Sequence, residues 1–270
     1  MSRDHFFCAL FILAVANGLE GYVLNDVATK GWSDGLIGLF GVSAVVWFAC
    51  FAVSGLLYRS RTSEVIAFFD AVIGLVIFSL TILPFARFSW LALCALSLYM
   101  LCVAPARSPR RRSALIGLAI TGPMLWGPAL FDVLGTQILQ ADAVLVSNLI
   151  GTDRVGNVIS AAIGSGGSPT RFVIYPGCSS LGGISIAVLA WMTISNALGS
   201  AWSARYFVCG LLAVASVLAI NVTRLSLIGL FPDYFPVIHG SPGAEIASWL
   251  SITVIVAISL LGIGREALRA

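Results

Sequence analysis

The sequence predicts an all-α integral membrane protein with about eight transmembrane helices, both termini in the cytoplasm, and a small extracytoplasmic hairpin. Three observations point to this class. Of the 270 residues, 59% are hydrophobic and only 10% are charged, whereas soluble domains carry about 25% charged residues. Eight apolar stretches are long enough to cross a bilayer, and arginines are concentrated in alternate connections between them. The net charge of +3 gives no indication of nucleic-acid binding.

Eight apolar stretches each have a length close to the roughly 17–25 residues that a transmembrane helix needs. The first of them is the least clear-cut. The predicted spans are 6–24, 36–58, 65–83, 88–104, 113–130, 180–198, 206–230 and 245–264. An Ala-x-Ala at residues 14–16 is also compatible with a cleaved signal peptide. Because only one arginine precedes the core and the apolar run continues to Leu24, a retained span is favoured.

The orientation follows from the basic residues, since short cytoplasmic loops collect Lys and Arg. With the N-terminus inside, ten basic residues fall in cytoplasmic segments: Arg3, Arg59, Arg61, Arg107, Arg110, Arg111, Arg112, Arg205, Arg265 and Arg269. Four fall in outer segments: Lys30, Arg87, Arg154 and Arg171. The sequence therefore predicts a multi-pass protein of the cytoplasmic (inner) membrane with both ends inside.

The longest outer segment, residues 131–179, is predicted to hold two elements. Residues 131–149 place apolar side chains on one helical stripe, which is typical of an amphipathic helix along the outer surface or of a continuation of the fifth span. The β-branched runs that follow flank "GSGGSP", which predicts a short hairpin with a flexible tip. Its return strand, "RFVIY", leads to Pro176, Gly177 and Cys178.

The six cysteines form no CxxC pair and have no metal-ligand spacing with the two histidines. A disulfide framework or a metal site is therefore not indicated. In the predicted topology, Cys178 is the only cysteine and His239 the only histidine in an outer segment. These two side chains are the candidates for outer-face chemistry.

Cys178 is expected at or just before the N-terminus of the sixth span. Free amides and the helix dipole there favour an anion and lower the pKa of a thiol. Ser179 and Ser180 are suitable capping residues, and their amides are also candidates to face an oxyanion. The alternative is that Cys178, like the other cysteines, is a small apolar residue used for packing.

Arg224 is expected about six residues below the outer end of the seventh span, roughly 9 Å at 1.5 Å per residue. An arginine within a span costs about 2.5–3.5 kcal/mol on insertion scales. Asn221 lies one turn earlier, so the two form a polar patch that is expected to face the protein interior. A snorkelling anchor is the alternative for Arg224, and a solvated surface residue is the alternative for His239.

Together these side chains match the requirements of acyl transfer through a thioester. A thiol nucleophile needs a base that also protonates the leaving amine, and histidine suits both steps. The tetrahedral intermediate needs positive charge or hydrogen-bond donors near its oxygen, which a guanidinium supplies. Such chemistry requires no metal or organic cofactor.

The order of these motifs resembles the exosortase/archaeosortase family of membrane transpeptidases. "PGCSSLGGIS" opens one span, "NVTRLSLIGL" lies late in the next, and "YFPVIHGSPG" precedes the last. The similarity extends over about residues 110–264. Two departures are Ser180, where the family commonly has glycine, and the "GSPGAE" that follows the histidine.

The resemblance implies that Cys178 is the nucleophile, Arg224 the transition-state stabiliser and His239 the acid and base. It also implies a substrate class, namely exported proteins with a C-terminal sorting tail made of a short motif, a transmembrane helix and a basic cluster, as in PEP-CTERM proteins. The enzyme would cut at the motif, on the extracytoplasmic side, and pass the new C-terminus to an acceptor.

Three other functions remain open from the residues alone. In a small-solute transporter or channel, Arg224, Asp70 and Glu20 would line a polar path, although the sequence has no internal repeat of the kind many transporters show. A thiol oxidoreductase would need a second outer cysteine. An inactive assembly partner is the third alternative.

Overall fold

The computed structural model describes residues 2–60, 64–163, 169–199 and 203–262. The chain divides into two compact units, of which the first holds residues 1–126 and 192–201 with the C-terminal end, and the second holds residues 127–191 and 202–262. Six described helices are long and apolar enough to cross a membrane. This architecture is consistent with an all-α, multi-pass membrane protein.

The six candidate spans run over Arg3–Ile37, Ala86–Val103, Pro109–Ile150, Ser180–Ala197, Ala204–Leu230 and Pro242–Gly262. Two of the eight predicted spans correspond to shorter apolar helices, Ala44–Tyr58 and Phe68–Thr81. At 1.5 Å per residue each of these is about 21–22 Å long, less than the roughly 30 Å of a bilayer core. The last two residues of the predicted span 245–264 lie outside the described residues.

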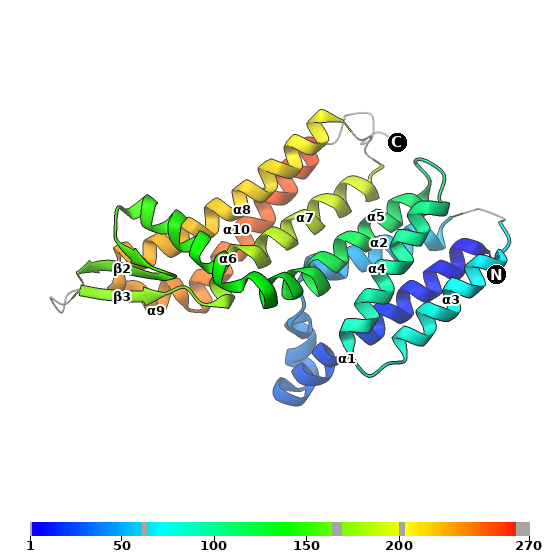
Figure 1. Ribbon diagram of the computed structural model, residues 1–270, viewed down its shortest axis with the longest axis horizontal. Helices are drawn as coiled ribbons and strands as arrows, with labels where there is room; N and C mark the ends of the chain where they lie inside the picture. Colours follow the sequence, from blue (N-terminus) through cyan, green and yellow to red (C-terminus); the bar gives the residue numbers. More distant parts are fainter. Residues whose placement is uncertain (1, 61–63, 164–168, 200–202, 263–270) are drawn as a thin grey trace. The chain divides into compact units, whose positions relative to one another are not determined.

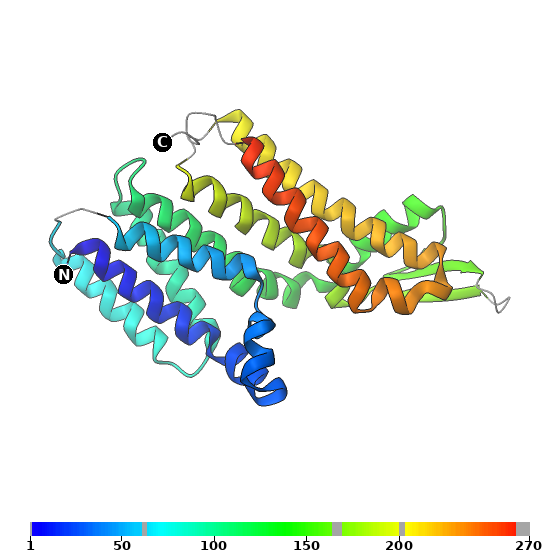
Figure 2. The same ribbon diagram turned by 180° about the vertical axis from the view of Figure 1, so that it is seen from behind.

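The first unit is a bundle of α1 (Arg3–Ile37), α2 (Ala44–Tyr58), α3 (Phe68–Thr81), α4 (Ala86–Val103) and α5 (Pro109–Thr121). Figure 1 shows α1 beside α3 and α4, and Figure 2 shows the same bundle from behind. Serine side chains cap the first turns of α1, α2 and α5 by accepting a backbone N–H, through Ser2, Ser43 and Ser108. Serine is among the preferred residues at this position.

The predicted span 36–58 is wrong in its first part. A 3₁₀ turn, η1 (Leu39–Gly41), interrupts the apolar run, and α2 begins only at Ala44. Leu39 and Phe40 both have positive φ, at 52° and 55°, a region that costs energy for residues with a Cβ. Ser43 then accepts the amide of Val45 and starts the new helix.

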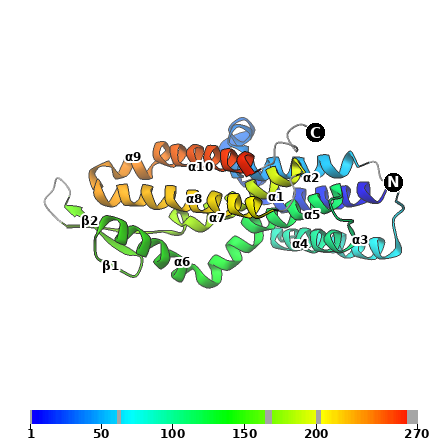
Figure 3. The same cartoon turned by 90° about the horizontal axis from the view of Figure 1, so that it is seen from above.

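The helix expected at residues 131–149 is α6 (Gly127–Ile150). It follows α5 along the chain through a π-helical turn, η2 (Gly122–Trp126), so the predicted continuation of the fifth span is confirmed. The helix bends at Leu134, whose φ and ψ are −116° and 15°, and Figure 3 shows the bend.

The predicted hairpin is confirmed as β2 (Val158–Ile163) and β3 (Pro169–Val173), an antiparallel pair. Its predicted tip, residues 164–168, lies outside the described residues. The sequence did not predict the short β1 (Arg154–Val155), which pairs with β2 and gives the order β1-β2-β3.

The second unit also contains η3 (Pro176–Cys178), most of α7 (Ser180–Ala197), α8 (Ala204–Leu230), η4 (Pro232–Tyr234), α9 (Phe235–His239) and α10 (Ser241–Gly262). Its core joins the sheet to α6 and α8 through Ala143, Val146, Ile159, Ile174, Cys178, Val222, Leu225 and Ile228. Gly183 of α7 leaves room for a side chain of α8, since a Cβ there would lie 2.8 Å from Val217 Cγ1. The nucleophile candidate is therefore part of a packed core.

Candidate active site

Cys178 ends the 3₁₀ turn η3, directly before α7. Pro176 fixes φ at the start of this turn, and the Cys178 amide donates to the Tyr175 carbonyl at 2.9 Å. Ser179 is extended, and α7 begins at Ser180. The thiol thus lies immediately before the helix, as the sequence predicts. The residue is 8% exposed.

The amides that follow Cys178 are already engaged. The Ser179 amide donates to the Pro176 carbonyl at 3.1 Å, and the Ser180 amide donates to Asp142 Oδ2 at 3.0 Å. The expectation that these two amides face an oxyanion is therefore wrong for this conformation. Ser179 instead accepts the Leu181 amide through its hydroxyl, at 3.3 Å, which is an N-terminal cap of α7.

Asn221 secures the cysteine from the side of α8. Its Nδ2 donates to the Cys178 carbonyl at 2.8 Å and to Ser180 Oγ at 3.0 Å. The sequence predicted Asn221 only as a polar neighbour of Arg224 in the protein interior. In the structure Asn221 also holds the backbone of the nucleophile candidate directly.

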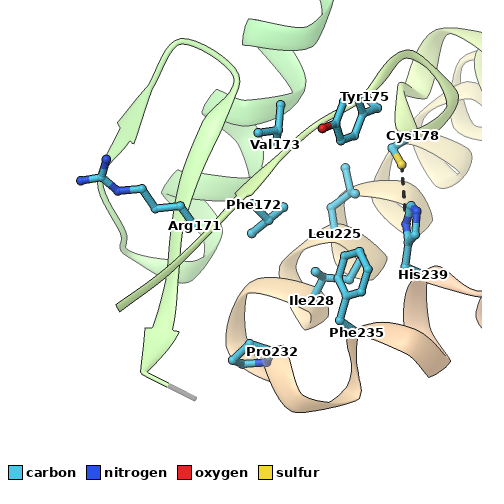
Figure 4. Close-up of a pocket in the computed structure, with 10 residues that line it drawn as sticks. All are labelled: Arg171, Phe172, Val173, Tyr175, Cys178, Leu225, Ile228, Pro232, Phe235 and His239. Carbon is cyan, nitrogen blue, oxygen red and sulfur yellow. Dashed lines mark hydrogen bonds between the residues drawn. The ribbon is translucent and has the colours of Figure 1, made fainter. Parts of the chain in front are cut away.

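His239 reaches the thiol from α9, 61 residues further along the chain. Its Nδ1 lies 3.8 Å from Cys178 Sγ, which is within reach of a hydrogen bond to sulfur. The imidazole stacks on Phe235, one helical turn earlier, with ring centroids 4.8 Å apart and an interplanar angle of 22°. Figure 4 shows the thiol and the imidazole side by side, joined by the dashed line.

Arg224 lies beside this pair but bonds to the backbone of α9. Its Nε donates to the Ile238 carbonyl at 3.2 Å, and its Nη2 donates to the His239 carbonyl at 3.4 Å. Carbonyls at a helix C-terminus lack intrahelical partners and carry partial negative charge. Arg224 satisfies two of them and so fixes the end of the helix that carries His239.

Two glycines explain the "GSPG" that follows the histidine. A Cβ on Gly240 would lie 2.2 Å from the Pro236 carbonyl oxygen, and a Cβ on Gly243 would lie 2.2 Å from that of Ile238. Only glycine permits this close wrapping of the chain around the end of α9. The glycines that follow the histidine thus have a local structural reason.

A cavity of about 320 Å³ opens next to the thiol and the imidazole. This volume is at the lower end of the range for ligand pockets, about 300–1,000 Å³. Its wall is largely apolar, with Phe172, Leu225 and Phe235 among the lining residues. Cys178 and His239 lie together at one side of the group, whereas the Arg171 side chain is directed away from them (Figure 4).

Asp70 and Glu20, the two acids of the first unit predicted to lie within spans, have different surroundings. Asp70 is fully buried and accepts hydrogen bonds from Arg3, Tyr99 and the Ala67 amide. Glu20 is exposed. Across the described ranges, no group of three or more His, Cys, Asp or Glu side chains is arranged to hold a metal ion.

No family model, curated protein or solved structure matches this chain. The functional assignment therefore depends on the geometry of the site itself. The structure brings Cys178, His239, Asn221 and Ser180 into direct contact and places Arg224 on the backbone next to His239.

Sequence reasoning missed Asp142. It lies within the segment 131–149, whose apolar stripe dominated the pattern, and its partner is 38 positions away. The available signal was an acidic residue in the otherwise apolar stretch "ADAVLV". This signal did not show which helix the acid caps.

Proposed function

We propose that this protein is an exosortase-like membrane cysteine protease or transpeptidase that removes the C-terminal sorting tail of exported proteins. In this proposal about eight apolar segments cross the cytoplasmic membrane, both termini are cytoplasmic, and Cys178 works at the outer face. The substrate is an exported protein with a short motif, a transmembrane helix and a basic cluster at its C-terminus.

One observation carries the proposal, namely the approach of Cys178 Sγ to His239 Nδ1 at 3.8 Å beside an apolar cavity. A packing cysteine has no need of an imidazole, and a solvated histidine has no need of a buried thiol. Their combination, with a cavity open to both, is the arrangement of an activated nucleophile.

The reaction that suits this pair has two acyl transfers. His239 Nδ1 takes the thiol proton, and the sulfur attacks the carbonyl carbon of the scissile peptide bond. The resulting tetrahedral intermediate collapses to a thioester when the C–N bond breaks, and His239 gives its proton to the leaving amine. An acceptor amine or water then attacks the thioester carbonyl and gives a proton to His239, the C–S bond breaks, and the departing thiolate recovers that proton from His239.

Arg224 contributes in two ways to this scheme. It holds the α9 carbonyls and hence the imidazole, and its guanidinium supplies positive charge near the carbonyl oxygen that becomes an oxyanion. Side-chain donors are needed there, because the amides of Cys178, Ser179 and Ser180 already donate elsewhere.

The test is mass spectrometry of the C-termini of exported membrane-associated proteins in cells that express this chain. We expect that at least one protein with an apolar C-terminal helix loses its tail with the unaltered enzyme and keeps it with Cys178→Ala. His239→Ala should slow this processing by roughly 10²–10⁴-fold, the usual contribution of acid–base catalysis.

Cys209→Ala is the matched control, since Cys209 is equally buried and lies in the same unit. It should leave processing unchanged. If the set of C-termini were identical with Cys178→Ala and the unaltered chain, the proposal would be overturned.

The transporter alternative has weaker support. A residue that lines a solute path must present a polar group to that path. Asp70 is fully buried and occupied by Arg3 and Tyr99. These pairings favour a structural role for Asp70 over the lining of a path.

A further inference from the structure

A buried carboxyl group outside the cavity contacts the start of the helix that follows Cys178. Asp142 of α6 is 4% exposed and accepts the first amide of α7, that of Ser180, at 3.0 Å. It is absent from the cavity lining. The Ser180 side chain accepts from Asn221, which also holds the Cys178 carbonyl.

This arrangement changes the role of the helix N-terminus. A free helix start favours a nearby anion because its amides and dipole carry partial positive charge. Here the Asp142 carboxyl group already occupies the first amide, and the Ser179 hydroxyl accepts the second. The first two amides of α7 are thus already hydrogen-bonded, to Asp142 and to Ser179.

We propose that Asp142 is a positioning residue for Cys178: its carboxyl group fixes the first turn of α7 so that the thiol meets His239. This inference rests on the proposed role of Cys178 as nucleophile, and it assigns a residue that lies outside the cavity.

Several titratable or charged groups surround the thiol and must be held constant in a test. They are His239 on α9, Arg224 on α8, Tyr175 before η3 and Arg171 on β3, whose side chain points away (Figure 4). From α6, the charged group that bonds to the start of α7 is Asp142. A change of Asp142 alone therefore isolates the contribution of this carboxyl group to the reactivity of the thiol.

The experiment measures the rate of Cys178 alkylation by iodoacetamide between pH 5 and pH 10, in the full-length protein in membranes. Mass spectrometry of the peptide that contains Cys178 separates it from the other five cysteines. Asp142→Asn keeps a hydrogen-bond acceptor of the same shape and removes the charge. Asp142→Ala removes both.

Asp142→Asn keeps an acceptor for the Ser180 amide, so His239→Ala should still change the alkylation rate in that background, by roughly tenfold at neutral pH. With Asp142→Ala, the thiol loses its fixed position, so the additional effect of His239→Ala should shrink to less than about twofold. If Asp142 supported only the overall fold, the effect of His239→Ala would be the same in both backgrounds.

The results separate this inference from the proposed function. If His239→Ala did not affect alkylation in the otherwise unaltered chain, the nucleophile proposal would itself be wrong. If His239→Ala affected alkylation in the unaltered chain and had the same effect in the Asp142→Ala background, only the role of Asp142 would be overturned.

Discussion

The first unit buries a network of opposite charges, whereas the site in the second unit fixes its polar groups through backbone atoms. In the first unit, Arg110 Nε contacts Asp4 Oδ1 at 2.5 Å, and its Nη2 contacts Glu64 Oε2 at 2.8 Å. In the second, Asn221 and Arg224 both donate to main-chain carbonyls. Both units must satisfy polar groups in an apolar chain, but they do so with different partners.

The difference separates a structural charge cluster from the proposed catalytic pair. A charge buried between opposite charges is neutralised, so it stabilises one conformation and has little capacity to exchange protons with a ligand. The thiol and imidazole of the second unit face each other beside a cavity, and the charges around them bond to the backbone. Proton transfer between sulfur and nitrogen can then occur without the loss of an ion pair.

The largest expected effect on stability concerns Arg110, which is 2% exposed. Arg110→Ala leaves the buried Asp4 without its cation, and removal of one partner from a buried pair costs about 3–5 kcal/mol. We expect a loss of this size in the free energy of unfolding, measured by denaturant titration in detergent. The pH profile of Cys178 alkylation in the folded protein should not change.

Arg111→Ala is the control for that experiment, because Arg111 is the exposed neighbour on the same helix. It should change the free energy of unfolding by less than about 0.5 kcal/mol. Equal losses for the two variants would contradict the view that the first unit depends on its buried charge network.

A smaller effect, confined to the second unit, is expected for Arg224→Lys. An ammonium lacks the planar fork that reaches both the Ile238 and His239 carbonyls, and a hydrogen bond to a charged group contributes about 1.5–3 kcal/mol. We expect tail processing to slow by roughly tenfold or more, with little change in the free energy of unfolding. The measurement is the processing rate at fixed expression level.

The matched substitution is Arg171→Lys, since this arginine is exposed and its head group points away from the thiol. It should leave processing within about twofold of the unaltered rate. If Arg224→Lys instead lowered the stability of the protein and spared processing, Arg224 would belong with the structural charges.

Much of the fold could be predicted from apolar length and turn chemistry. The bounds of α7 and α8 differ from the predicted spans 180–198 and 206–230 by at most two residues, because each is a continuous apolar run between polar connections. The break at η1 was missed because Leu39 and Phe40 are apolar, so the composition of this stretch gives no sign that the helix is interrupted. Their positive φ is set by the local turn and not by side-chain polarity.

The candidate site was predictable only in part, for a physical reason. Order along the chain pointed to Cys178 and His239, whose chemistry is visible in their residue types. The Asp142 contact depends on how α6 packs against the start of α7, which no local pattern encodes. The role of Arg224 at the α9 carbonyls likewise depends on the turn formed by Gly240 and Gly243.

The smallest expected effect concerns Glu64, which belongs to the charge network of the first unit. Glu64 precedes α3 and receives a hydrogen bond from Arg110, and this bond, aided by Arg3, holds the pKa of Glu64 below its ordinary value of 4.5. Because the folded-state pKa is lowered, the stabilisation is present above the unfolded pKa and is lost as the pH falls through the folded one. The Glu64 side chain is 43% exposed, so its contribution should be below about 1 kcal/mol.

The measurement compares the melting temperature of the unaltered chain with that of Glu64→Gln from pH 7 to pH 3, in detergent. Glu64→Gln should melt a few degrees lower near pH 7, and the gap should close as the pH falls through the lowered pKa of Glu64 and the carboxylate is protonated. A gap that persisted unchanged at pH 3 would mean that Glu64 acts through its shape and not its charge. The stability of the first unit would then depend less on charge pairing than its geometry indicates. The contrast with the proposed catalytic pair of the second unit, Cys178 and His239, would be weaker.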